Sequence, residues 1–421
     1  MARQASGEFA WGDLIYDWNT REPGSRPEPS LFEILDETLR DGLQNPSVKD
    51  PCLLDKIELV GRMEALGIHV VNTGLPSASP RAFDDVLGIC RAIRDRGMRI
   101  RPAAAGRTLV ADVTPIIEIS QRLGLSIETN VFIGSSPVRQ LTEDWELPVM
   151  IRRSAEAIDA VVRAGLPATF VTEDATRSRP DVLSALFRNA VEHGATRVCL
   201  ADTVGHATPI GIEALVRFTR KTLDEAGAGA VGIDFHGHDD RGLALANSLM
   251  ALRCGVNRVH ATALGIGERV GNTPMEQLLV NLKLSGQLEG QDVSAMPEYS
   301  RAAARMLGWS IPVDYPVVGR DAFRTASGVH ASAIVKAQIK GQSWLADLVY
   351  SSIPASAFGR RQEIEIGYMS GASNVIYWLR ERKLEAQPEL VSAILLAAKK
   401  ADHSLTEPEV MALIEAWQRS R

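Results

Sequence analysis

A pair of histidines two positions apart is the feature of this sequence most suited to binding a metal ion. His236 and His238 lie in the run DFHGHDD, residues 234–240. Side chains at positions i and i+2 of a strand point to the same face, so both imidazoles can offer a nitrogen to one cation. The alternative is a polar strand end with solvated histidines, and the pair alone does not decide between the two.

A carboxylate that would complete such a site lies in the run DETLRDGLQN, residues 36–45. If the fold is a closed barrel, its first and seventh strands end on the same rim, and Asp41 can join the two histidines. Two imidazoles and one carboxylate with open positions suit a divalent catalytic cation. The alternative is a charged surface loop, which is disfavoured because two independent segments meet the same requirement.

A third candidate segment is the glycine-rich run GIGERVGN, residues 265–272. Gly265 and Gly267 permit the close backbone approach that a phosphate or a thioester chain would need. Such glycines are also common in tight turns. Asn272, at the end of the run, could add an amide oxygen to the metal site.

Eight short apolar segments, with amphipathic helical stretches between them, must position these residues. Strands that alternate with helices predict parallel βα units. The predicted strands are residues 31–35, 69–72, 100–104, 126–132, 168–171, 197–201, 231–235 and 258–261. A helix is predicted after the first strand, with Asp50 as its cap and Pro51 in its first turn.

The number of units matches a TIM barrel, an α/β fold of eight βα units over about 250 residues. A doubly wound open sheet would look alike locally. Polar residues follow nearly every predicted strand, however, and this favours a barrel mouth, because an open sheet would concentrate them at one switch point.

The strand–helix rhythm stops after about residue 290. We therefore predict an N-terminal arm (1–30), a TIM-barrel catalytic domain (31–290) and a C-terminal, mainly helical lid and dimerisation region (291–421). Helices are predicted there at 299–307, 323–337 and 388–401. A T-x-x-E capping box at Thr406 opens a final helix.

Composition excludes several classes of protein. The 421 residues include 46 Lys+Arg and 52 Asp+Glu, a net charge of −6, so the chain has no general attraction to nucleic acid or to an anionic membrane. No apolar run approaches the length of a membrane span, and we expect no signal peptide. The four cysteines lie far apart, which fits a reducing cytosol. We expect a cytoplasmic enzyme with neither nucleic acid nor membrane as a partner.

Six runs together resemble the DRE-TIM metallolyase superfamily, and most of all its isopropylmalate, homocitrate and citramalate synthase branch. The resemblance covers about residues 31–421. The runs are ETLRDG (37–42), TEDATR (172–177), ADTVG (201–205), HGHDDRGLALAN (236–247), GIGERVGN (265–272) and SGVH (327–330).

The resemblance implies a TIM barrel that binds Mg²⁺, Mn²⁺, Zn²⁺ or Co²⁺. It also implies a Claisen-type condensation of acetyl-CoA with a 2-oxo acid, followed by thioester hydrolysis to a 2-alkylmalate-type product and CoA. The metal-site residues that it implies are Asp41, His236, His238 and Asn272. The implied catalytic residues are Arg40, Glu173 and His330. The implied substrate-binding residues are Gln44, Thr203, Gly265, Gly267 and Glu268.

The resemblance implies a chemical role for Arg40 and for His330. Arg40 would lie over the keto oxygen and stabilise the developing alkoxide. His330 would act as the base that removes a methyl proton from acetyl-CoA, since imidazole titrates near neutral pH. In the family the lid that carries this histidine reaches across a homodimer into the partner's barrel. The alternative for His330 is an interface histidine.

The chain departs from the family pattern around the implied oxo-acid pocket. Asn72 stands where many relatives have glutamate, Val171 where a serine is common, and Asn130 in place of a histidine. The run GRRQ (359–362) lacks the tyrosine that some synthases carry after Gly-Arg, and Tyr350 or Tyr368 could substitute for it. The sequence therefore leaves the oxo acid open among 2-oxoisovalerate, pyruvate, 2-oxoglutarate, oxaloacetate and analogues of specialised metabolism.

Three other functions share some of these features. A hydroxymethylglutaryl-CoA-type lyase would use the same metal site, but such lyases carry a cysteine in the loop after the eighth strand, and residues 265–272 have none. An iron oxygenase with two histidines and one carboxylate is the second alternative. A non-catalytic metal-binding relative is the third.

Overall fold

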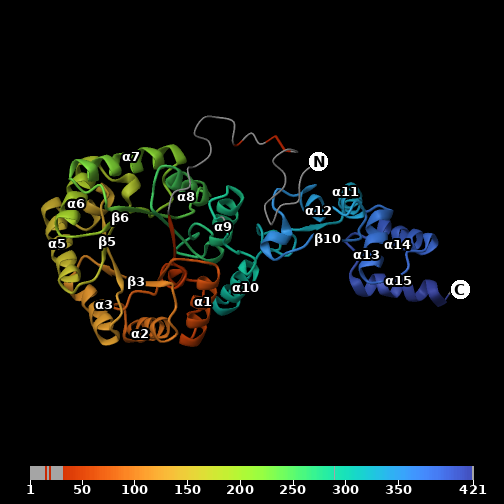
Figure 1. Cartoon of the computed structure of the whole chain (residues 1–421), viewed down its shortest axis with the longest axis horizontal. Coiled ribbons are helices and arrows are strands. Elements are labelled where there is room, and N and C mark those ends of the chain that lie inside the picture. The colour runs from red at the N-terminus through yellow and green to blue at the C-terminus, as the bar shows by residue number, and fades with distance from the viewer. Residues whose placement is uncertain (1–14, 17–18, 20–31, 289, 420–421) are drawn as a thin grey trace. The chain divides into compact units, whose positions relative to one another are not determined.

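Eight parallel strands close into a barrel in the order β1 to β8 (Figure 1). The computed structural model describes residues 15–16, 19, 32–288 and 290–419. The strands are β1 (Glu33–Asp36), β2 (Val70–Asn72), β3 (Arg101–Arg107), β4 (Glu128–Gly134), β5 (Ala168–Glu173), β6 (Arg197–Asp202), β7 (Gly232–Gly237) and β8 (Arg258–Ala261). The predicted TIM barrel is confirmed, and each predicted strand is present; the ends of β8 are as predicted, and those of the other strands lie within three residues of the prediction.

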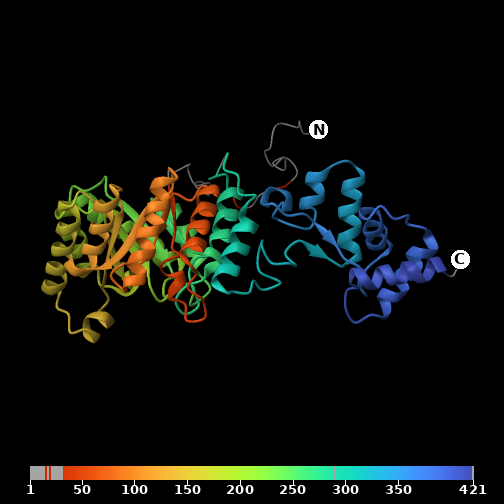
Figure 2. The same ribbon diagram turned by 90° about the horizontal axis from the view of Figure 1, so that it is seen from below.

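Ten helices accompany the strands, and most of them form an outer layer around the barrel (Figures 1 and 2). They are α1 (Leu53–Ala65), α2 (Pro80–Asp95), α3 (Val110–Leu123), α4 (Pro137–Thr142), α5 (Leu147–Arg163), α6 (Pro180–Glu192), α7 (Pro209–Glu225), α8 (Ala244–Arg253), α9 (Met275–Leu284) and α10 (Met296–Leu307). Proline in the first turn starts α2, α5, α6 and α7, where its missing N–H costs nothing.

The predicted cap of α1 is wrong. The helix begins at Leu53 with Cys52 as its N-cap, so Asp50 and Pro51 precede it. Asp50 instead forms an ion pair with Lys56, 2.6 Å between Oδ1 and Nζ. This pairing draws the carboxylate away from the helix end that it was expected to cap.

The barrel unit extends beyond the predicted boundary at residue 290. The compact unit that contains the barrel runs to Ser310, and the second compact unit begins at Ile311. The difference is α10, which packs against α1 of the barrel. The predicted N-terminal arm lies almost wholly outside the described residues.

The second unit contains a small sheet that periodicity did not predict. Its two strands, β9 (Arg324–Thr325) and β10 (Glu363–Ile364), are parallel and two residues long. Because β9 occupies the start of the predicted 323–337 helix, that helix begins later than expected. The helices of this unit are α11 (Gly328–Ile339), α12 (Ser343–Leu348), α13 (Ala372–Glu381), α14 (Pro388–Lys400) and α15 (Glu407–Arg419).

A single apolar core holds the last three helices together. It is built around Val375, Leu379, Ile394 and Val410, which come from α13, α14 and α15 and are fully buried. At the start of α15 the backbone N–H of Thr406 donates to the Glu409 carboxylate over 2.7 Å, as a capping box requires. Among the described residues, no helix is long and apolar enough to cross a membrane.

Asp36, at the end of β1, ties α10 to the barrel and gives a testable pH dependence. The Tyr299 hydroxyl of α10 donates to its buried carboxylate, and burial raises the pKa of Asp36 to about 6. The contribution of the protonated Asp36 side chain to the free energy of unfolding is therefore complete below its unfolded pKa near 4. This contribution is lost as pH rises through about 6. The difference between the unfolded and folded pKa of Asp36 corresponds to about 2–3 kcal/mol in the free energy of unfolding.

We expect the Tm of wild type minus that of Asp36→Asn to fall as pH rises from about 4.5 to 7.5. Asparagine keeps an acceptor for the Thr38 N–H, 2.7 Å away in the wild type, but it does not titrate. Thermal unfolding followed by circular dichroism measures both proteins across this range. A Tm difference independent of pH would show that the Asp36 carboxylate is not the responsible group.

Candidate active site

Three side chains from separate segments converge at the carboxyl end of the barrel. Asp41 follows β1, His236 lies in β7 and His238 follows it. The Nε2 atoms of His236 and His238 are 3.2 Å apart. Asp41 Oδ2 lies 3.8 Å from His236 Nε2 and 3.5 Å from His238 Nε2. The three side chains are buried and form a group able to hold one cation. The structure thus brings together the three residues that spacing and barrel topology predicted.

The charge state of the three groups suits a cation. Burial, together with the neighbouring His238, lowers the pKa of His236 to about 3, and burial also lowers the pKa of His238. Burial would raise the pKa of Asp41, but Arg40, the two histidines and the Asn272 hydrogen bond together outweigh it and lower that pKa. Near neutral pH the site therefore presents two neutral imidazoles and one carboxylate, the protonation state that binds metal ions.

Asn272 lies against the same carboxylate. Its Nδ2 donates to Asp41 Oδ1 over 2.6 Å, and its own Oδ1 is buried without a hydrogen-bond partner. An orphaned amide oxygen beside two imidazoles and a carboxylate fits a cation of mixed nitrogen and oxygen coordination. The residues present therefore fit a divalent ion.

The structure explains the glycines near Asn272 by the folding of their own loop. A Cβ at Gly267 would clash with the Asn272 amide nitrogen, and Gly271 has a φ of 96° and lies against the carbonyl of Gly265. The close approach that these glycines permit is therefore that of the loop to Asn272 and Asp41. Neither Gly265 nor Gly267 is among the described residues that line the pocket beside Asp41, His236 and His238.

A pocket opens beside the three convergent side chains. Five further predicted site residues line it together with Asp41, His236 and His238: Arg40, Gln44, Glu173, Thr203 and Glu268. Burial raises the pKa of Glu173, against the opposing charges of Arg139 and Arg40. The Thr203 hydroxyl accepts the Asp174 N–H over 2.8 Å, which fixes the side chain at the rim.

His330 lies in the other compact unit, in α11. Its ring stacks on that of Tyr350, with centroids 3.9 Å apart and planes at 26°. Tyr350 is one of the two tyrosines that could substitute for the tyrosine missing from the run GRRQ, and it is half exposed.

Arg40 is held by a residue that the sequence did not single out. Its Nε donates to Glu37 Oε2 over 2.7 Å, and its Nη1 donates to Asp41 Oδ2 over 3.2 Å. Burial opposes ionisation of Glu37, but Arg40 and then His260 hold its pKa well below the usual range. The guanidinium is therefore fixed in orientation beside the metal-site residues.

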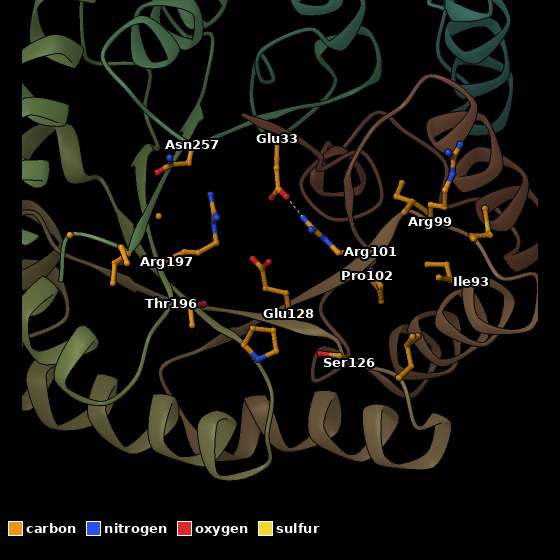
Figure 3. A pocket seen from close by; sticks show the side chains of 18 of the residues that line it. Glu33, Ile93, Arg99, Arg101, Pro102, Ser126, Glu128, Thr196, Arg197 and Asn257 are labelled. Carbon is orange, nitrogen blue, oxygen red and sulfur yellow. Dashed lines mark hydrogen bonds and ion pairs between the residues drawn. The ribbon is translucent and has the colours of Figure 1, made fainter. Parts of the chain in front are cut away.

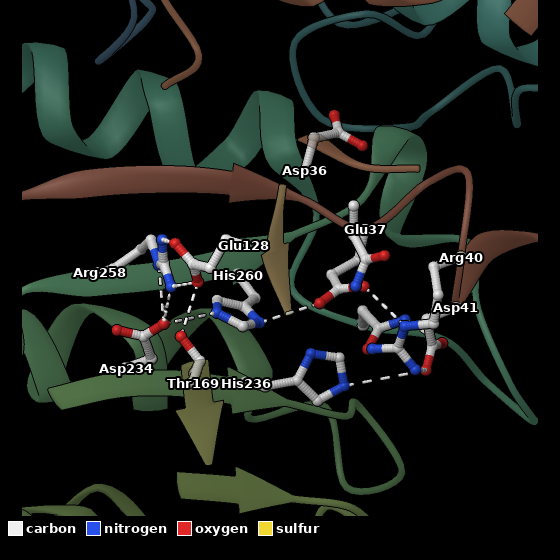
Figure 4. Close-up of polar contacts among 12 residues, drawn as sticks. Asp36, Glu37, Arg40, Asp41, Glu128, Thr169, Asp234, His236, Arg258 and His260 are labelled. Atoms are coloured by element: carbon white, nitrogen blue, oxygen red, sulfur yellow. Dashed lines mark hydrogen bonds and ion pairs between the residues drawn. The ribbon is translucent and has the colours of Figure 1, made fainter. Parts of the chain in front are cut away.

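A buried polar chain continues from Glu37 through the barrel interior (Figure 4). His260 lies between Glu37 and Asp234, with its Nδ1 3.1 Å from Glu37 Oε1 and its Nε2 3.3 Å from Asp234 Oδ2. Arg258 then joins Asp234, over 2.7 Å, to Glu128, over 2.8 Å. The alternation of side chains along a strand could have predicted one of these buried polar residues, because Asp234 precedes His236 by two positions on the same strand face.

A second cavity lies at the opposite, amino-terminal end of the strands (Figure 3). Glu33, Arg101, Glu128 and Arg197 line it, and Arg101 pairs with Glu33 over 2.5 Å. None of the predicted site residues is among the described residues that line it. In TIM barrels this end serves stability, and the active site belongs to the other end.

The matches to known proteins agree with this geometry. A family model described as HMGL-like matches residues 31–302. The chain belongs to the HMGL-like family. Homocitrate synthase AksA of Methanothermobacter thermautotrophicus is 31% identical to this HMGL-like protein, over 88% of this chain and 89% of that one. A probable 2-isopropylmalate synthase of Methanopyrus kandleri is also 31% identical, over 88% of this chain and 70% of that one.

Among solved structures, an HMG-CoA lyase from Brucella melitensis matches with a TM-score of 0.54 and 22% identity, over 65% of this chain and 98% of that one. At this identity the likeness shows the barrel fold alone. The predicted superfamily is confirmed by the family match, and the predicted enzyme class, a condensing acyltransferase, is that of the two curated relatives.

Proposed function

We propose that this HMGL-like protein condenses acetyl-CoA with a 2-oxo acid and hydrolyses the resulting thioester, with a divalent cation as cofactor. The observation that carries the proposal is the convergence of Asp41, His236 and His238 beside a fixed Arg40. The names of the curated relatives support it, since both are synthases. The cytoplasmic location stays a prediction.

Asp41, His236 and His238 would hold the cation, with Asn272 beside them. When bound, Mg²⁺, Mn²⁺, Zn²⁺ or Co²⁺ supplies a Lewis acid that polarises the keto carbonyl. A base removes a proton from the methyl group of acetyl-CoA, and the enolate carbon bonds to the keto carbon as the carbonyl π bond opens to an alkoxide, which then takes up a proton. The charge that develops on the keto oxygen lies where the Arg40 guanidinium stabilises it. Water then cleaves the thioester and releases CoA.

We assign the role of the base to His330, in the C-terminal lid. Its imidazole stacks on Tyr350, which places a phenol next to it. A lid excludes water while the enolate exists. As in the family, we propose that the lid serves the partner's barrel in a homodimer.

Complementation between two inactive variants tests this arrangement. His236→Ala removes the metal site and His330→Ala removes the base, so each homodimer is inactive. After subunit exchange we expect about a quarter of wild-type activity, because about half of the dimers are mixed and each then has one intact site. An inactive mixture, with exchange verified by mass spectrometry, would place His330 with its own barrel, and an active His330→Ala homodimer would place it outside the chemistry.

Release of the CoA thiol from acetyl-CoA, in the presence of metal and a panel of 2-oxo acids, tests the function itself. A synthase consumes acetyl-CoA and exposes a free thiol. A lyase instead forms acetyl-CoA from a hydroxyacyl-CoA and releases no thiol, so incubation with hydroxymethylglutaryl-CoA, followed by measurement of acetyl-CoA formation, distinguishes the two. Metal binding with neither activity would favour a non-catalytic role.

A further inference from the structure

The rim of the pocket is divided between a metal half and an apolar half. The metal-site residues come from β7 and from the segments that follow β1 and β8. On the remaining part of the rim, β3 to β6 and the segment after β2 contribute a different set of side chains. These are Leu75, Ala105, Phe132, Val171 and Ala201. A substrate held at the metal half would extend its side chain toward this apolar wall.

Two buried amides interrupt the apolar wall, and neither carries a charge. Asn72 and Asn130 line the pocket and are almost fully buried. Among the described residues the Oδ1 of Asn130 has no hydrogen-bond partner, so this oxygen is available to a ligand. A neutral amide can hydrogen-bond a polar atom but cannot neutralise a carboxylate.

The charged groups of the pocket are mainly negative. Glu37, Asp41, Glu173 and Glu268 line it, and Arg40 is the one guanidinium or ammonium group among the described lining residues. Arg40 is already engaged, because it donates to both Glu37 and Asp41.

Two further guanidinium groups lie near the pocket without being among the described residues that line it, and both face carboxylates. Arg269 pairs with Asp240 over 2.8 Å and donates to the Thr203 carbonyl over 2.6 Å. Arg139 is not a lining residue, and its Nη2 lies 3.3 Å from the Glu143 carboxylate and 4.0 Å from that of Glu173. A second carboxylate on the substrate would therefore enter the apolar half without a cation to pair with, beside Glu173. Burial of an unpaired charge is strongly unfavourable.

We propose that the 2-oxo acid of this enzyme has an uncharged, mainly apolar side chain and is not a dicarboxylate such as 2-oxoglutarate or oxaloacetate. The inference rests on the proposed function and narrows its substrate class. The names of the relatives leave open whether the 2-oxo acid carries an apolar side chain or a second carboxylate, and the inference decides between these two classes.

Matched substrate pairs test the inference directly. 2-Oxopentanoate and 2-oxoglutarate have the same chain length and differ in a terminal methyl group against a carboxylate, and 2-oxobutyrate and oxaloacetate form a second pair. We expect kcat/KM from thiol release to favour the monocarboxylate of each pair by at least about 100-fold, the scale of an unpaired buried charge. Equal values, or a preference for a dicarboxylate, would overturn the inference.

Calorimetric binding of each pair to the metal-loaded full-length protein separates this inference from the proposed function. A preference for 2-oxopentanoate without any thiol release would support the pocket assignment and reject the condensation. Thiol release with a preference for 2-oxoglutarate would reject the pocket assignment and keep the condensation. Binding of both acids with equal affinity and no turnover would reject both.

A charge placed on the apolar wall provides a second test. Val171→Lys puts an ammonium beside the expected substrate side chain, and Val171→Met is the uncharged control of similar length. We expect the lysine variant alone, and not the methionine control, to shift the ratio of kcat/KM toward 2-oxoglutarate by about tenfold or more. Equal shifts in the two variants would show that the size of the side chain at position 171, and not its charge, determines the substrate preference.

Discussion

Replacing His238 by alanine is expected to abolish turnover while the barrel stays folded. The loss should exceed about 10³-fold, because a Lewis acid contributes several kcal/mol to stabilising the transition state. His238 lies at the barrel mouth, next to Asp41, and not in the apolar core. Thiol release measures the activity, elemental analysis of the protein measures the metal content, and circular dichroism measures the fold.

His206→Ala is the matched control. This histidine belongs to the segment after β6, is exposed and is not among the residues that line the pocket. It should keep nearly all activity and metal. Near-normal activity in His238→Ala would show that the assigned metal site does not carry the reaction.

Replacing Arg40 by lysine is expected to reduce kcat by about 10²-fold or more, the scale of a lost oxyanion donor, with a smaller change in KM. In the proposed mechanism Arg40 acts on charge that appears only in the transition state, and an ammonium cannot reproduce the planar fork of donors. The fork is in use, since Nε binds Glu37 while Nη1 faces Asp41. Initial rates at saturating and limiting oxo acid separate kcat from KM.

Arg217→Lys is the control for this variant. Arg217 lies in α7, pairs with Glu213 over 2.7 Å and is not among the described residues that line the pocket. Its replacement should leave kcat within about twofold, as expected for a partly exposed ion pair. A change confined to KM in Arg40→Lys would mean that Arg40 only binds the substrate.

The barrel and the convergence of Asp41, His236 and His238 could be predicted from the sequence because both depend on simple periodicity. Parallel strands buried between helices appear as short apolar runs at regular intervals, and polar residues after them mark the mouth. His236 and His238 share a face because they are two positions apart, and barrel closure brings Asp41 to them.

The rest of the site depends on three-dimensional detail that periodicity does not contain. Glu37 has the same sequence signal as any acidic residue in a loop, and only its contacts with Arg40 and His260 reveal its role. The two-residue strands β9 and β10 are too short to show alternation. The role of His330 stays a prediction, since its ring contact with Tyr350 belongs to the lid unit alone.

The buried charges inside the barrel restrict how this protein can change in evolution. Arg258 is fully buried between Asp234 and Glu128, so loss of any one of the three leaves a buried charge short of a partner, at a cost of up to about 3–5 kcal/mol. Replacement of the whole cluster by apolar residues of similar volume carries no such penalty. Single substitutions at these three positions should therefore be rare among homologues, and the positions should change together, as a covarying set that marks lineages within the family.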